Sequence, residues 1–206
     1  MRVKICGITN EADAAMVSRA GADALGMVFY PPSPRHVADF GLARAIVQAV
    51  NPFISIVALV VNPDKAWLEE LLSSVPVNLI QFHGDESPEF CESFYRPYVK
   101  ALRMKEGLDI NSESQRYASS AGILLDTYKK GVPGGTGESF NWDLVPKQRT
   151  RPIILAGGLD ATNVAQAIAV AKPDAVDVSG GVEAGPGKKS VVEVERFITA
   201  AKTCCS

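Results

Sequence analysis

The chain has 206 residues, of which 47% are hydrophobic and 21% are charged, so it can bury one sizeable core. Its formal net charge of -2 gives no reason to expect nucleic acid or an anionic membrane surface as a partner. The first residues contain no basic leader with an apolar core, and no apolar run is long enough to span a membrane. We therefore expect one domain over residues 1–206, in the cytoplasm.

The four cysteines do not have the spacing of a metal site. Cys6, Cys91, Cys204 and Cys205 form no CxxC pair, and no histidines follow them at zinc-site intervals. The sequence therefore predicts no bound metal and reduced thiols.

Eight short apolar runs alternate with longer amphipathic stretches along the chain. The runs are rich in Val, Ile and Leu, as expected of parallel strands that are buried on both faces. The loop after the first run lacks the glycine fingerprint of an open dinucleotide-binding sheet. The alternation predicts an α/β fold, a single (β/α)8 TIM barrel. The predicted strands are 2–6, 24–29, 54–61, 79–82, 98–102, 122–126, 152–156 and 175–179.

Capping residues and helix breakers bound the stretches between these strands. Asn10 is a typical N-cap, Gly21 is a typical residue after a helix end, and Pro63 and Pro88 suit helix starts. The predicted helices are 10–20, 42–50, 64–74, 89–95, 112–119, 142–145, 160–171 and 189–201.

In this fold the active site lies on the loops that follow the strands. Gly157 and Gly158 follow the seventh predicted strand, and Ser179, Gly180 and Gly181 follow the eighth. Glycines leave backbone N–H groups bare for an anion, and loops after strands seven and eight usually hold phosphate in these barrels. One glycine pair would indicate only a tight turn, but two pairs at both expected positions favour a phosphate site.

Cys6 and Asp126 end the first and sixth predicted strands. A free cysteine is most often a small buried hydrophobe, but a thiol at this edge can also act as a base. Asp126 can hold a loop through backbone N–H groups, or it can donate a proton if partial burial raises its pKa. Together they would supply one base and one acid across the barrel mouth.

Four further features border the same edge. Lys4 shares strand parity with Cys6, and a buried ammonium needs a partner, for which we expect Asp177. Arg35, in a proline-rich loop, is either a solvated charge or a contact for a carboxylate or aromatic ring. His83 suits packing, or support of a neighbouring catalytic group, slightly better than catalysis. The glycine-rich segment 131–137 is a candidate lid.

The sequence resembles the phosphoribosylanthranilate isomerases of tryptophan biosynthesis over essentially its whole length. The first and last shared motifs are more specific than the glycine pairs alone. The motifs are KICGIT at 4–9, GMVFY at 26–30, SPR at 33–35, QFHG at 81–84, LD at 125–126, GGTG at 134–137, AGGL at 156–159, DVSGGVE at 177–183 and PGKK at 186–189.

The resemblance implies an aldose–ketose isomerase that performs an Amadori rearrangement. It would convert N-(5-phosphoribosyl)anthranilate to 1-(2-carboxyphenylamino)-1-deoxyribulose 5-phosphate without a cofactor or metal. By the family pattern, Cys6 is the general base, Asp126 is the general acid and Arg35 contacts the anthranilate part. The expected partner is this small phosphorylated substrate, and the protein is expected to be a monomer or a homodimer.

Two alternatives use the same phosphate site. Another sugar-phosphate barrel enzyme, such as indole-glycerol-phosphate synthase, the histidine-pathway aminoaldose isomerase or a pentose-phosphate epimerase, would use other catalytic groups, and Cys6 disfavours all three. A non-catalytic phosphometabolite sensor would have lost the acid or the base, and both are present.

Overall fold

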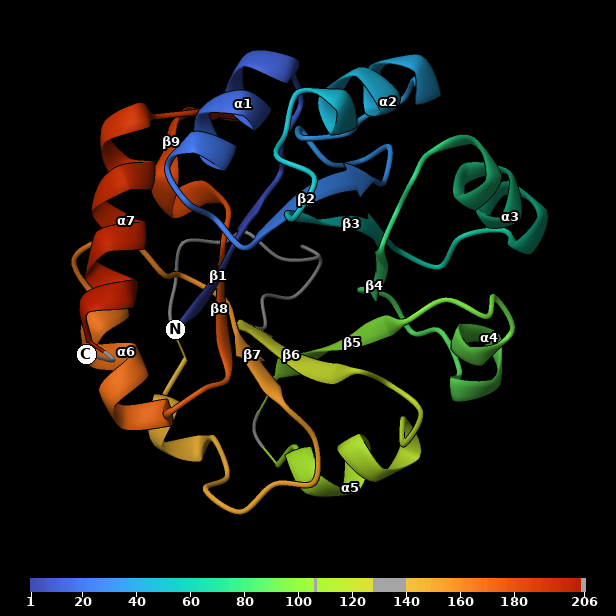
Figure 1. The fold of residues 1–206 in the computed structure, drawn as a ribbon. Coiled ribbons are helices and arrows are strands. Elements are labelled where there is room, and N and C mark those ends of the chain that lie inside the picture. The colour runs from blue at the N-terminus through green and yellow to red at the C-terminus, as the bar shows by residue number, and fades with distance from the viewer. Residues whose placement is uncertain (106, 128–139, 205–206) are drawn as a thin grey trace.

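The computed structural model describes residues 1–105, 107–127 and 140–204. Eight parallel strands, β1 to β8, form one closed barrel in chain order, with helices around its outside (Figure 1). Strand β1 pairs with β2 on one side and with β8 on the other, which closes the barrel. The predicted TIM barrel is therefore confirmed.

The strands lie close to the positions predicted from the apolar runs. Three predicted strands have the observed bounds, and the others differ by one or two residues at an end. The strands are β1 (Arg2–Cys6), β2 (Ala24–Phe29), β3 (Ser55–Val60), β4 (Leu79–Phe82), β5 (Tyr98–Met104), β6 (Gly122–Thr127), β7 (Ile153–Leu155) and β8 (Ala175–Val178).

The helices begin at capping side chains. Asn10, Asp39, Asp64 and Ser87 each accept a hydrogen bond from a backbone N–H in the first turn that follows. The helices are α1 (Glu11–Arg19), α2 (Phe40–Gln48), α3 (Lys65–Ser74), α4 (Pro88–Glu92), α5 (Ile110–Arg116), α6 (Val164–Ala171) and α7 (Val191–Thr203), with 3-10 turns η1 (Trp142–Leu144) and η2 (Gly180–Val182).

The predicted helix starts differ from the observed ones by at most four residues, and the two differences beside the barrel mouth, after β7 and β8, have a structural cause. The helix expected from residue 160 begins at Val164, because the Asp160 carboxylate accepts hydrogen bonds from the backbone N–H groups of Thr162 and Asn163 and forms a turn. The helix expected from residue 189 begins at Val191. Before it, β9 (Glu183–Gly185) and β10 (Lys188–Lys189) form a small antiparallel hairpin that the sequence pattern did not predict.

The strands are buried on both faces, as their composition predicted. Outside the barrel, side chains such as Ile5, Leu25 and Ile123 pack against the helices in one large core and are fully buried. Inside it, several charged side chains are also buried, among them Lys4, Asp126 and Asp177. Among the residues with described positions, no helix is long and apolar enough to cross a membrane.

Candidate active site

A cavity of about 800 Å³ opens at the carboxyl ends of the strands. Every residue that the sequence analysis assigned to the site lines it, so the structure brings together residues from both ends of the chain. They are Cys6, Arg35, His83, Asp126, Gly157, Gly158, Ser179, Gly180 and Gly181. The candidate lid at 131–137 lies outside the described residues.

Cys6 is the last residue of β1 and is 5% exposed. Its strand neighbour in β2 is Gly26, and it packs with Val28 and Leu59 on the inner wall. Burial raises the pKa of the Cys6 thiol above its usual value, and the nearby Lys4 ammonium offsets this only in part. The thiol therefore faces the cavity as a weak acid whose ionised form needs a cation beside it.

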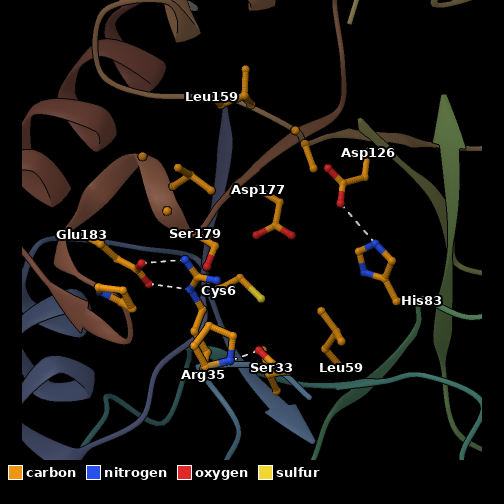
Figure 2. A pocket seen from close by; sticks show the side chains of 18 of the residues that line it. Cys6, Ser33, Arg35, Leu59, His83, Asp126, Leu159, Asp177, Ser179 and Glu183 are labelled. Atoms are coloured by element: carbon orange, nitrogen blue, oxygen red, sulfur yellow. Dashed lines mark hydrogen bonds and ion pairs between the residues drawn. The ribbon is translucent and has the colours of Figure 1, made fainter. Parts of the chain in front are cut away.

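Asp126 lies in β6, and its two carboxylate oxygens have different partners. Oδ1 accepts a hydrogen bond of 2.8 Å from the backbone N–H of Thr127. Oδ2 lies 3.2 Å from Nε2 of His83, whose other ring nitrogen lies 3.3 Å from the Gln81 amide (Figure 2). His83 thus contacts the carboxylate directly, which fits the predicted support of a neighbouring group.

The glycine loops after β7 and β8 lie close to their neighbours. Gly157 has a φ of +80°, and a methyl group there would press against Oγ1 of Thr127 and would lie 2.9 Å from Oδ1 of Asp126. A methyl group on Gly181 would press against the Leu159 carbonyl group and would lie 3.1 Å from Cβ of Asp160. These glycines allow the loops to approach β6 and each other, and their role in phosphate binding stays a prediction.

Arg35 is not a solvated loop charge, because its side chain is only 16% exposed and makes two hydrogen bonds. Its Nε and Nη2 atoms each donate to one carboxylate oxygen of Glu183 in β9, both at 2.7 Å (Figure 2). Lys189 in β10 also donates to Glu183, at 2.7 Å. The pKa of Glu183 is lowered, because the contacts with Arg35 and Lys189 outweigh the effect of burial.

Sequence reasoning assigned no role to Glu183 or Lys189, although both fall within quoted motifs. No local sequence pattern marks them, because their positions depend on the unpredicted hairpin of β9 and β10, which places the Glu183 carboxylate 2.7 Å from Nζ of Lys189. Gly7, with a φ of +77°, completes the arrangement, since a methyl group there would lie 2.5 Å from Cδ of Arg35. The site is therefore richer in charge than the strand-end residues alone indicated.

The predicted partnership of Lys4 and Asp177 is present. Nζ of Lys4 lies 2.7 Å from Oδ2 of Asp177, and both side chains are buried. Asp177 also lines the cavity, between Cys6 and the contact of Asp126 with His83 (Figure 2). Among the described residues, no group of three or more His, Cys, Asp or Glu is arranged to hold a metal ion.

The whole barrel resembles known isomerases. Residues 3–200 match the family model of N-(5'-phosphoribosyl)anthranilate isomerase. The N-(5'-phosphoribosyl)anthranilate isomerase of Pseudomonas putida strain F1 is 55% identical over 202 residues, which cover 98% of each chain.

Solved structures agree with the sequence comparison. The phosphoribosylanthranilate isomerase of Thermotoga maritima has a TM-score of 0.90 at 40% identity, with 98% of this chain and 99% of that one covered. The same coverage is found for an isomerase in complex with reduced 1-(o-carboxyphenylamino)-1-deoxyribulose 5-phosphate, at a TM-score of 0.87 and 39% identity. Monomers generated from the dimeric Thermotoga maritima enzyme also have this coverage, with a TM-score of 0.84 at 37% identity. The chain belongs to the N-(5'-phosphoribosyl)anthranilate isomerase family.

Proposed function

We propose that the chain converts N-(5-phosphoribosyl)anthranilate to 1-(2-carboxyphenylamino)-1-deoxyribulose 5-phosphate, an Amadori rearrangement of tryptophan biosynthesis. The observation that carries this proposal is the opening of Cys6 and Asp126 into one cavity, in a chain of this family. The cavity of about 800 Å³ is large enough for a substrate of this size.

Catalysis requires one acid and one base that act in turn. Protonated Asp126 donates its proton to the ring oxygen, the bond from C1 to that oxygen breaks, and the nitrogen lone pair forms a C1–N iminium. The Cys6 thiolate then removes the proton from C2, and the electron pair of that bond forms the C1–C2 double bond of an enolamine. Return of a proton to C1 and loss of the C2 hydroxyl proton give the ketone, so the reaction is redox-neutral overall.

The remaining lining residues suit the two ends of this substrate. The bare backbone of the loops after β7 and β8 supports a phosphate site at Gly157, Gly158, Ser179, Gly180 and Gly181. Arg35 is the candidate for the anthranilate carboxylate, because guanidinium geometry suits carboxylates. His83 would act chiefly through Asp126, which it contacts.

The proposal also covers the setting of the enzyme. The partner is the small phosphorylated substrate, and the protein acts as a monomer or a homodimer in the cytoplasm. The dimeric relative from Thermotoga maritima and the monomers generated from it support both states of assembly.

The test is to mix purified protein with N-(5-phosphoribosyl)anthranilate and to follow the decay of its fluorescence, with the product identified by mass spectrometry. We expect enzyme-dependent decay to the ketose. Folded protein that leaves the substrate unchanged would contradict the proposal, and conversion to an indole product would favour the synthase alternative.

A further inference from the structure

Lys4 and Cys6 lie two residues apart in β1 and share the inward face of the barrel. Both are at least 93% buried, with exposed fractions of 7% for Lys4 and 5% for Cys6. The pairing neighbour of Cys6 in β2 is Gly26, and a methyl group there would lie 2.8 Å from Sγ of Cys6 and 3.1 Å from Nζ of Lys4. The glycine thus leaves a gap into which the sulfur and the ammonium both project.

The Lys4 ammonium has two partners in this gap. It donates a hydrogen bond of 2.7 Å to Oδ2 of Asp177, which stands opposite Lys4 in the pairing of β1 with β8. The gap beside Gly26 also brings it next to the Cys6 thiol, with which it interacts by charge. An ammonium has three N–H donors, so it can serve both partners at once.

Three cations interact with Cys6 by charge, namely Lys4, Arg35 and Lys189, and their other contacts distinguish them. Arg35 and Lys189 both donate to Glu183, whose carboxylate offsets much of their charge. Lys4 is the one of the three whose ammonium shares the gap beside Gly26 with the sulfur, and its charge affects the pKa of Cys6 more than that of Lys189 does. The anion that interacts with Cys6 by charge is Asp177. Asp177 itself interacts by charge with Asp126 and His83.

We propose that Lys4 is a positioning residue for the base: anchored by Asp177 in the gap beside Gly26, its ammonium stabilises the Cys6 thiolate in the barrel by its charge. The inference rests on the proposed function of Cys6 as the base. Lys4 lies beneath the cavity rather than on its lining, so its effect reaches the substrate only through Cys6.

The physical reason is the cost of a buried anion. A thiolate in an apolar wall is unfavourable unless a cation lies beside it. Burial by itself would lower the pKa of Lys4, but Asp177 and Cys6 together raise it above its usual value, so the cation persists when the thiol ionises. At separations of about 4 Å such charges interact strongly even at intermediate effective dielectric constants.

The experiment measures the ionisation of Cys6 directly. In a Cys204→Ser/Cys205→Ser background, the rate of alkylation by iodoacetamide is followed against pH, and the same background with Cys6→Ala supplies the blank. Burial raises the pKa of Cys91 to about 12, so its thiol contributes little. We expect Lys4→Met to slow alkylation of Cys6 at neutral pH at least about tenfold, because less thiolate is present.

Lys100→Met is the matched control, because Lys100 is also buried and also lies 2.7 Å from a carboxylate, that of Glu86. It contacts Glu86 and Gly84 rather than the sulfur, so it should leave the pH profile of Cys6 alkylation unchanged. Lys4→Arg retains the charge and should restore much of the rate. Equal profiles for Lys4→Met and the parent, or equal shifts in the two methionine variants, would overturn the proposal.

A double variant keeps the test valid if Lys4→Met does not fold. Lys4→Met/Asp177→Asn removes both buried charges, and the alkylation should still be slower than in the parent, because Lys4 affects the pKa of Cys6 more than Asp177 does. The measurement uses no substrate. A normal kcat for Cys6→Ala would therefore refute the role of Cys6 as the base, without bearing on the effect of Lys4 on the thiol. An alkylation profile that does not shift in Lys4→Met would refute the role of Lys4, without bearing on the role of Cys6.

Discussion

Arg35 and Glu183 lie 148 residues apart in sequence and are joined by two hydrogen bonds of 2.7 Å. This paired geometry fixes the plane of the guanidinium at the edge of the cavity. Lys189 shares the same carboxylate, so the hairpin of β9 and β10 holds Arg35 in place. The orientation of Arg35 is therefore set before any substrate arrives.

Arg35→Lys tests whether this orientation matters for binding. Lysine keeps the positive charge but cannot donate two parallel hydrogen bonds to Glu183. We expect KM for the substrate to rise about tenfold, the equivalent of about 1.4 kcal/mol, with kcat changed far less. Steady-state kinetics check this, and an unchanged KM would remove Arg35 from substrate recognition.

Glu183→Gln should lower stability as well as affinity. The amide keeps the shape of the side chain but leaves Arg35 and Lys189 without their shared anion. Breaking a buried ion pair by removing one partner is costly, and for the Glu183 side chain, which is 6% exposed, we expect a loss of about 2 kcal/mol in the free energy of unfolding. Urea denaturation measures it. If Arg35→Lys/Glu183→Gln loses no more stability than Glu183→Gln alone, the two residues are coupled. If the losses of the two single variants add up in the double variant, the shared arrangement is contradicted.

Gly157→Ala should lower kcat by displacing Asp126. The added methyl group would press against Oγ1 of Thr127, the residue after Asp126, and would lie 2.5 Å from the backbone nitrogen of Thr127 and 2.9 Å from Oδ1 of Asp126, where the backbone has a φ of +80°. Gly21→Ala is the matched control, since Gly21 has a φ of +91° but nothing lies within 4 Å of its added methyl group. Backbone strain should cost each variant about 1–2 kcal/mol of stability, and Gly157→Ala should lose more because of its close contacts. Only Gly157→Ala should lose activity, and equal kcat values would contradict the role of this close approach.

The pH dependence of the reaction should report the buried thiol. Because burial raises the pKa of Cys6, the thiol is mostly protonated at neutral pH in the free enzyme. Its thiolate, and with it kcat/KM, should therefore increase as pH rises from neutral into the alkaline range. Initial rates at low substrate concentration across this range test the prediction. A profile that is already flat at neutral pH would mean that the thiolate is more stable than its surroundings indicate.

Much of the barrel was predictable because apolar runs and capping residues are local signals. The strands β1, β2 and β4 begin and end where the apolar runs do. The parity of Lys4 and Cys6, together with the closure of β8 on β1, was enough to predict the contact with Asp177. The strand-end rule brought Cys6 and Asp126 to one cavity without any knowledge of loop structure.

The unpredicted features depend on contacts between distant segments. The strands β9 and β10 have three and two residues, too few for a periodic pattern, so their hairpin gave no signal. The partner of Arg35 follows from that hairpin and was missed with it. The late start of α6 arises from competition between the Asp160 side chain and the helical backbone, which composition alone does not resolve.

The most direct test of the central claim compares kcat for Cys6→Ala and Asp126→Ala with that of the parent enzyme. Cys91→Ala is the control, because it removes another buried thiol that does not line the cavity. We predict that each of the first two variants loses about 10²–10⁴-fold in kcat with little change in substrate affinity, while the control retains its kcat. Near-normal turnover by folded Cys6→Ala or Asp126→Ala would contradict the assignment of that residue as base or acid.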